Sequence, residues 1–423
     1  MTTTPGTSGE LSGVPGVPGE LSAVSRVPGE MSAAPSPGMI NGAVGAGAGV
    51  TVGVVVPTCG RRPTLLRAAL ASVLGQDWPG PLDVVVVVDG GTHLAAAHAE
   101  AVGERQVEPR GEAEALRRGG ARGAAGVWGP VGMWGETAGG SLRETAGGSR
   151  GEAAGGSLGE GVGRVAEQVA DVVAGGCPPG RGAVRVVANR FRPGLPGARN
   201  TGIAALTTDF VAFCDDDDAW LPGKLTAQLA ALSARPGAEF ASCAITVEYR
   251  SRSVTRLAGK DVITSTDLSR SRMVMVHSST FLFRRGALWA DETAPNGQNE
   301  DWDLALRAAK RHPIAHVDRP LVRVRWGASD YVTRWGDRIA GLEWMLARHT
   351  ELAVDPRGAA RIYGQLAFHH AALGRRREAV RWAARACAAR PAEPRAPLAL
   401  AVAAGLLSAQ GVLSLLHTRG HGI

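Results

Sequence analysis

The stretch that decides the fold, residues 210–222, reads FVAFCDDDDAWLP. Residues 211–214 are an unbroken apolar run, which predicts a buried strand, and Pro222 followed by leucines at helical spacing predicts a helix just after the turn. The four aspartates at 215–218 therefore follow the carboxyl end of a strand. In open α/β sheets this is the edge at which ligands bind.

Four carboxylates this close together favour a bound cation. Asp215 and Asp217 have the Asp-x-Asp spacing that lets two carboxylates share one ion or the phosphates bound to it. Hard oxygen donors without a histidine or cysteine ligand suit Mg²⁺ or Mn²⁺ rather than zinc. The alternative is a solvated acidic turn, since charge runs are often only exposed surface.

Outward from this stretch, the sequence alternates between strand and helix patterns. Residues 51–56 and 82–88 are continuous apolar runs, as parallel strands covered on both faces require. Leucines and alanines between 63 and 74 form one helical stripe, valines between 162 and 173 form a second, and residues 184–187 predict another strand. The fold class is therefore α/β, with a mixed, mostly parallel sheet flanked by helices.

Two segments are low in complexity. Residues 1–48 carry a ten-residue repeat rich in Pro, Gly and Ser, and residues from about 103 to 160 carry an eight-residue repeat around Ala-Gly-Gly-Ser. Neither composition buries enough apolar surface to offset the entropy of ordering. We expect a disordered tail, then a domain at 49–335 that contains a disordered insertion, then a helical region at 336–423.

Five motifs in a fixed order carry a resemblance to a known family. They are Pro57-Thr58-Cys59-Gly60-Arg61, Asp89-Gly90-Gly91, Gly197-Ala198-Arg199-Asn200-Thr201-Gly202, Asp215 to Asp218 with Trp220, and Glu300-Asp301-Trp302-Asp303-Leu304. From residue 50 to about 330, apart from the insertion, the chain resembles the family 2 glycosyltransferases, which are inverting enzymes of GT-A fold. The family's commoner Asp-Asp-Gly-Ser is replaced here by Val88-Asp89-Gly90-Gly91. The resemblance therefore does not indicate which nucleotide base the donor carries.

The resemblance implies that the donor is a nucleoside-diphosphate sugar. Pro57, Thr58 and Asp89 would then bind the nucleotide, although an aspartate before glycine also caps turns without any ligand. In the aspartate turn, the resemblance implies that Asp217 is the direct metal ligand. Its partner would be Asp215 or Asp218, with Asp215 nearer the ribose.

Three more charged residues belong to the predicted site. Arg199 either reaches the donor diphosphate or forms a structural salt bridge with the aspartates, and its planar fork suits both roles. Asp301 is the expected base that takes the proton of the acceptor hydroxyl, and Glu300 would orient the acceptor or the loop. Both carboxylates could instead simply favour a helix N-terminus. His277 could line the acceptor site, but a lone histidine beside a strand more often has a structural role.

Composition limits the function classes. The 423-residue chain carries a net charge of +7 that comes almost wholly from arginine. The basic residues are not gathered into one arm with interleaved aromatics, so the sequence does not indicate a nucleic-acid partner. Five cysteines, odd in number and widely spaced, favour a reducing compartment over a disulfide framework. A cytoplasmic location is therefore expected.

The C-terminal part has a helical pattern beyond about residue 335. Residues 398–416 contain no charge over nineteen positions, close to the length of a membrane helix, but glycines and polar residues dilute them. Docking on the protein core is the first expectation. Peripheral contact with the inner face of the membrane is the second.

The predicted function is a metal-dependent inverting glycosyltransferase that moves a sugar to an acceptor hydroxyl. The acceptor could be a saccharide, a lipid-linked molecule or a small molecule. The alternative is a non-catalytic carbohydrate-binding or scaffold protein with a degenerate transferase domain. The intact acidic motifs favour the enzyme.

Overall fold

The computed structural model describes residues 49–90, 158–174, 183–249, 251–326 and 334–418. The expectations for the N-terminal tail and for most of the insertion fall outside these residues. Helix α3 (Leu158–Ala174) begins close to residue 160, at about which the insertion was expected to end.

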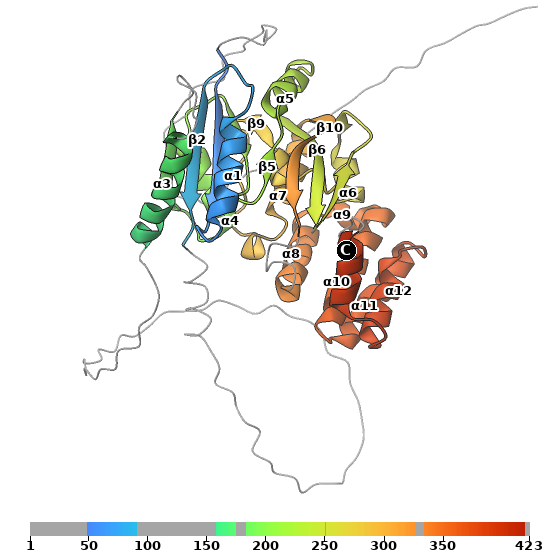
Figure 1. Ribbon diagram of the computed structural model, residues 1–423. Helices are drawn as coiled ribbons and strands as arrows, with labels where there is room; N and C mark the ends of the chain where they lie inside the picture. Colours follow the sequence, from blue (N-terminus) through green and yellow to red (C-terminus); the bar gives the residue numbers. More distant parts are fainter. Residues whose placement is uncertain (1–48, 91–157, 175–182, 250, 327–333, 419–423) are drawn as a thin grey trace, which may run out of the picture. The chain divides into compact units, whose positions relative to one another are not determined.

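A mixed sheet of ten described strands carries the fold (Figure 1). On one side lie four parallel strands in the order β3 (Val184–Ala188), β2 (Leu82–Val88), β1 (Val52–Thr58) and β4 (Phe210–Phe213). The sheet continues with β9 (Leu282–Arg284), β6 (Phe240–Tyr249), β10 (Ile314–Arg325) and β5 (Ala219–Trp220), while β7 (Arg252–Arg256) pairs with β6 and β8 (Val262–Ile263) with β10. The predicted α/β class with a mixed sheet is confirmed, and each predicted strand lies within two residues of its expected range.

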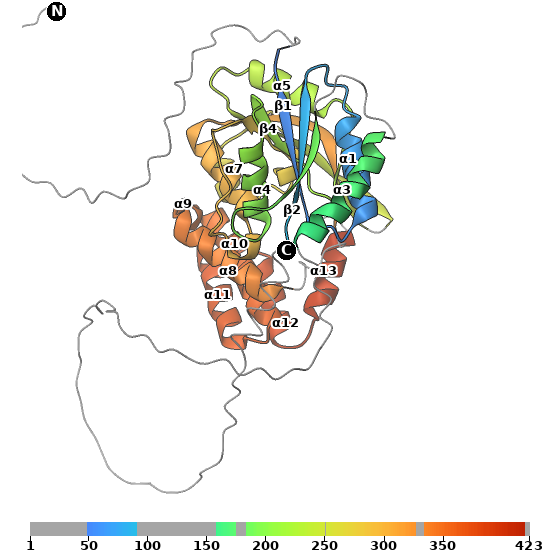
Figure 2. The ribbon, with the colours of Figure 1, turned by 90° about the vertical axis from the view of Figure 1, so that its left-hand side faces the viewer.

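Helices cover both faces of the parallel strands (Figure 2). Helices α1 (Pro63–Leu74) and α3 lie on one face, and α4 (Leu195–Ala205) lies on the other. Helix α4 approaches β1 closely, because a Cβ placed on Gly202 would lie 2.2 Å from Val55 Cγ1. Helix α5 (Lys224–Ser233) packs on β6 and β10.

The segments that connect the later strands contain four more helices. Helix α6 (Ser265–Arg270) is followed by the short helices η1 (Ser278–Thr280) and η2 (Pro295–Gly297), and then by α7 (Glu300–Arg311). Helix α7 begins at Glu300, so both acidic residues of the last motif stand in its first turn. The Trp302 side chain, which follows them, is fully buried.

The C-terminal helices pack against the sheet domain. They are α8 (Trp335–Arg348), α9 (Glu351–Val354), α10 (Pro356–Ala372), α11 (Arg376–Ala389), α12 (Arg395–Ala403) and α13 (Ala409–Thr418). Leu352, Ile362 and Leu366 belong to the same buried cluster as the valines of β1 and β2. The expected helical appendage is therefore present, and its first helices share the core of the sheet domain.

Residues 398–416 do not form one helix. A turn with Gly405 at φ +79° separates α12 from α13, and a left-handed φ is one that glycine adopts without strain. Val412 and Leu413 of α13 are buried beside Phe368 of α10. Among the residues that the structure describes, no helix has the length and apolar character needed to cross a membrane. Peripheral membrane contact stays a prediction.

Candidate active site

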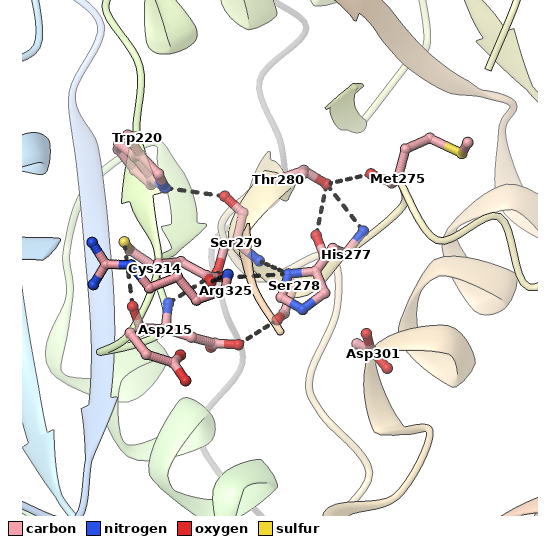
Figure 3. A network of polar contacts seen from close by, with 12 residues as sticks. Cys214, Asp215, Trp220, Met275, His277, Ser278, Ser279, Thr280, Asp301 and Arg325 are labelled. Atoms are coloured by element: carbon pink, nitrogen blue, oxygen red, sulfur yellow. Dashed lines mark hydrogen bonds and ion pairs between the residues drawn. The ribbon is translucent and has the colours of Figure 1, made fainter. Parts of the chain in front are cut away.

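The aspartate turn follows β4 and lies at the carboxyl ends of the parallel strands. Asp215 accepts hydrogen bonds from Arg199 (2.8 Å) and from the Ser278 hydroxyl (2.9 Å) (Figure 3). Asp218 is buried and accepts from the Ser279 hydroxyl (2.6 Å). Helix η1 therefore holds the first and the last aspartate of the turn through two adjacent serines.

The two middle aspartates face the end of β1. Asp216 accepts a hydrogen bond from the Thr58 hydroxyl (2.6 Å) and pairs with Arg62 (2.5 Å). Asp217 also pairs with Arg62, which is about one third exposed. Burial, helped by the charges of Asp217 and Asp215, raises the pKa of Asp216 to about 6 despite Arg62. The turn therefore holds more negative charge than its arginines neutralise.

A possible cation position lies between the turn and helix η1. Single ligand atoms of Asp215, Asp218 and His277 all lie within 4.8 Å of one another. Burial and the charges of Asp215 and Asp217 raise the pKa of Asp218 well above its usual range, so a cation here would relieve carboxylate repulsion. These residues fit a divalent ion. The premise that no histidine would be near was wrong, because the chain returns His277 to the turn from 59 residues beyond Asp218.

Arg199 joins the aspartate turn to the last motif. Its side chain is 1% exposed, and its guanidinium pairs with Asp215 on one side and with Glu300 on the other. Glu300 is also buried, and its second carboxylate oxygen has no hydrogen-bond partner in the described part of the chain. Of the two roles expected for Arg199, the geometry shows the salt bridge. Glu300 faces this arginine.

Asp301 stands beside this bridge at the start of α7. Arg272 donates to both of its carboxylate oxygens (2.8 and 2.7 Å), and the side chain keeps 13% exposure. Burial would raise the pKa of Asp301, but the charges of Arg272, His277 and Arg199 outweigh it and lower the pKa below its usual value. Asp301 is therefore an ionised carboxylate at neutral pH. Figure 3 shows it on α7, across from His277 and Ser278.

The expected nucleotide residues lie at the ends of β1 and β2. Pro57 and Thr58 are buried, and Thr58 contacts the aspartate turn as described above. Asp89 accepts hydrogen bonds from the Asn189 amide (3.1 Å) and from the Gly194 backbone N–H (2.9 Å). Asp89 therefore ties the end of β2 to the loop that precedes α4.

Two arginines of the site were not singled out from the sequence. Arg62 pairs with Asp216 and Asp217, and Arg272 pairs with Asp301. In an arginine-rich chain, neither residue differs in its local sequence from arginines that are merely exposed. The one available signal for Arg62 was its position directly after the Pro57 motif.

Comparisons with known proteins agree with this architecture. Residues 161–290, from α3 to just beyond β9, match the family model described as Glycosyl transferase family 2. No curated protein matches the sequence.

Similar solved structures include S. aureus TarS and a mannosyltransferase. S. aureus TarS superposes with a TM-score of 0.42 and 13% identity, over 84% of this chain and 53% of that chain, so this chain spans about half of that structure. TarS 1–349 in complex with UDP-GlcNAc superposes with a TM-score of 0.45 and 12% identity, over 88% of this chain and 93% of that chain. The mannosyltransferase PcManGT from Pyrobaculum calidifontis, in complex with GDP-Man and Mn²⁺, has a TM-score of 0.35 and 17% identity, over 87% of this chain and 79% of that chain.

The matched segment contains the Arg199 motif and the whole aspartate turn. The mixed sheet around it has helices on both faces and the turn at its ligand-binding edge. Residues 161–290 are therefore similar to the family 2 glycosyltransferases and form part of a mixed α/β sheet domain.

Proposed function

We propose that this chain transfers a sugar from a nucleoside-diphosphate sugar to an acceptor hydroxyl, with inversion at the anomeric carbon and with Mg²⁺ or Mn²⁺ as cofactor. One observation carries the proposal. Arg199 bridges Asp215 and Glu300, so the aspartate turn and the first turn of α7, which carries Asp301, meet at one buried arginine. A donor phosphate at the turn and an acceptor hydroxyl at Asp301 would thus share one site.

The aspartate turn is proposed to hold the cation and the donor. A divalent ion supplies charge neutralisation to a departing diphosphate. Asp217 remains the proposed direct ligand, with Asp215 or Asp218 as its partner, but Arg62 pairs with Asp217, so this ligand set requires Arg62 to turn outward. The set of Asp215, Asp218 and His277 needs no such movement. Pro57, Thr58 and Asp89 would bind the nucleotide beside it.

Asp301 is proposed to act as the general base. Inverting transfer requires a carboxylate that accepts the hydroxyl proton while the oxygen attacks the face opposite the leaving group. Asp301 is ionised and partly exposed, so it can accept this proton, and the two bonds from Arg272 fix the plane of its carboxylate. Glu300 faces Arg199, so we propose that it orients the loop rather than the acceptor.

The base assignment is tested with Asp301→Asn. Donor binding is measured first, as the thermal shift produced by a panel of UDP- and GDP-sugars with and without Mn²⁺, because a ligand of the native state raises the unfolding temperature. Asp301→Asn is expected to keep this shift and to lose transfer by about 100-fold or more. Asp171→Asn, an exposed aspartate paired with Arg67, is the matched control and keeps full activity. Retained turnover in Asp301→Asn would rule out the assignment.

The two ligand sets are separated by Asp217→Ala and His277→Ala. If Asp217 binds the ion, Asp217→Ala loses Mn²⁺-dependent donor hydrolysis, while His277→Ala keeps most of it. The opposite result would assign the ion to Asp215, Asp218 and His277. Donor hydrolysis that is independent of divalent ions in the unmutated protein would contradict both.

A further inference from the structure

A basic cavity lies beside α6 and α10, and the aspartates of the turn do not line it. Its volume is about 540 Å³, and its walls come from the end of β7, the segment 270–275, α10 and the start of α12. Asp267 is the one acidic residue in its lining, and it is held by Lys260 at 2.7 Å. Six arginines line the same space: Arg256, Arg270, Arg272, Arg357, Arg361 and Arg395.

Three of these arginines already have carboxylate partners outside the cavity lining. Arg270 pairs with Asp355, Arg272 with Asp301, and Arg395 with Glu393. Within the described residues, neither Arg357 nor Arg361 forms an ion pair. The cavity therefore presents at least two positive charges that the protein does not neutralise.

Arg361 is the residue that most clearly needs a ligand. It is 8% exposed, and its Nη1 atom donates a long hydrogen bond to Gln365 (3.4 Å). Its Nε and Nη2 atoms have no hydrogen-bond partner among the residues that the structure describes. Its guanidinium lies 4.9 Å from the centre of the Trp302 ring. Burial and the charges of Arg395 and Arg272 lower the pKa of Arg361 to about 9, so it stays charged at neutral pH. A buried cation with two unpartnered nitrogens is costly, and an oxyanion would supply the missing acceptors.

The cavity adjoins the proposed base. Arg272 lines it and donates to Asp301, while Arg361 stacks on Trp302, the next residue of α7. The segment that forms this wall then continues to His277 beside the aspartate turn. The turn, where the donor diphosphate is proposed to bind, has its own arginines in Arg62 and Arg199. The cavity therefore adjoins Asp301 and Trp302 through Arg272 and Arg361.

We propose that this cavity binds a phosphate group carried by the acceptor, with Arg361 as its main ligand and Arg357 as a second. The inference rests on the proposed function, because it names the class of acceptor that the transferase takes. The planar fork of arginine matches phosphate oxygens, and two uncompensated charges suit a dianion better than a single carboxylate. Leu257, Met273 and Met275 give the cavity an apolar wall for the organic part of the acceptor.

The test is calorimetric titration of the full chain with glycerol 3-phosphate, inorganic phosphate and glycerol, in buffer with EDTA so that no metal at the turn binds the probe. Glycerol 3-phosphate is expected to bind more tightly than inorganic phosphate because of the apolar wall, and glycerol is expected not to bind. Arg361→Gln should weaken the binding of glycerol 3-phosphate by about tenfold or more, and Arg357→Gln by about threefold. Arg377→Gln, an exposed arginine of α11, removes the same charge elsewhere and should change nothing.

Three outcomes would overturn the proposal. They are the absence of binding by both phosphates, an unchanged affinity in Arg361→Gln, and equal affinity for the two phosphates, which would identify a site for free phosphate. If Arg361→Gln does not fold, the exposed Arg357→Gln carries the test. Donor-induced thermal shifts are recorded on the same proteins. A missing donor shift contradicts the proposed transferase function, whereas the phosphate titration judges the cavity alone.

Discussion

At the scale of single residues, the site depends on Arg199. The Arg199→Met variant would leave half-buried Asp215 and buried Glu300 without their shared cation. Removing one member of a buried ion pair costs ~3–5 kcal/mol, because the remaining charge is desolvated and unpaired. We therefore expect the free energy of unfolding, measured by urea denaturation, to fall by about this amount. Arg67→Met breaks an exposed ion pair with Asp171 and should change the free energy of unfolding by less than ~1 kcal/mol. A similar small loss for Arg199→Met would contradict the structural role.

The residues that could be predicted are those with a local signal. The four aspartates stand out because they directly follow an apolar strand, and Arg199 because it lies in a glycine-flanked motif. The pairs formed by Arg62 and Arg272 could not be predicted in the same way. Arg62 meets Asp217 across 155 residues and Arg272 meets Asp301 across 29, so each contact exists only once the sheet has formed.

At the scale of elements, the close contact between α4 and β1 sets the position of the Arg199 motif. A Cβ on Gly202 would lie 2.2 Å from Val55, so Gly202→Ala must push the helix away from the strand. We expect this variant to lower the free energy of unfolding by ~1–3 kcal/mol. Gly163→Ala in α3 is the matched control, since a Cβ there meets nothing within 4 Å. Gly163→Ala should raise the free energy of unfolding by ~0.5–1 kcal/mol, because alanine has a higher helix propensity than glycine. Thermal unfolding of both proteins checks the pair, and equal effects would refute the packing argument.

The elements that the sequence predicted are those with a long, uniform pattern. Residues 82–88 are all apolar but one, and the strand has those bounds. In contrast, β5 and β8 have two residues each, which is too short for any periodicity to show. Their pairing with β10 comes from the tertiary fold. The break between α12 and α13 was only partly visible, because Gly405 was one of several residues diluting an apolar run.

At the scale of the whole described molecule, the C-terminal helices are anchored to the transferase domain by an ionic contact. Asp303 of α7 is fully buried and accepts bonds from Arg307 of the same helix and from Arg348 (2.6 Å) and His349 (2.9 Å) at the end of α8. The helical pattern beyond residue 335 predicted an appendage. The pattern could not predict this contact, because Asp303 lies 45 residues before Arg348 and meets it only in the folded chain.

The Asp303 contact makes stability depend on pH in a defined direction. Burial alone would raise the pKa of Asp303, but the hydrogen bonds from His349, Arg307 and Arg348, together with the charge of Arg307, lower it to about 2. Because this folded-state pKa is below the unfolded value of 3.8, the contact stabilises the protein above about pH 4 and loses this effect as the pH falls toward 2. The contribution is about 2–3 kcal/mol at pH 7.

Asp303→Asn measures this contribution. At pH 7 the variant should unfold in urea with a free energy at least ~2 kcal/mol below that of the unmutated protein. The gap should narrow between pH 5 and pH 3, because the aspartate of the unfolded chain, with a pKa of 3.8, takes up a proton in this range while the native carboxylate, with a pKa of about 2, stays ionised. Asp171→Asn, which removes an exposed carboxylate, should show a gap below ~0.5 kcal/mol at every pH. A gap for Asp303→Asn that stays constant down to pH 3 would mean that packing, and not charge, joins α7 to α8.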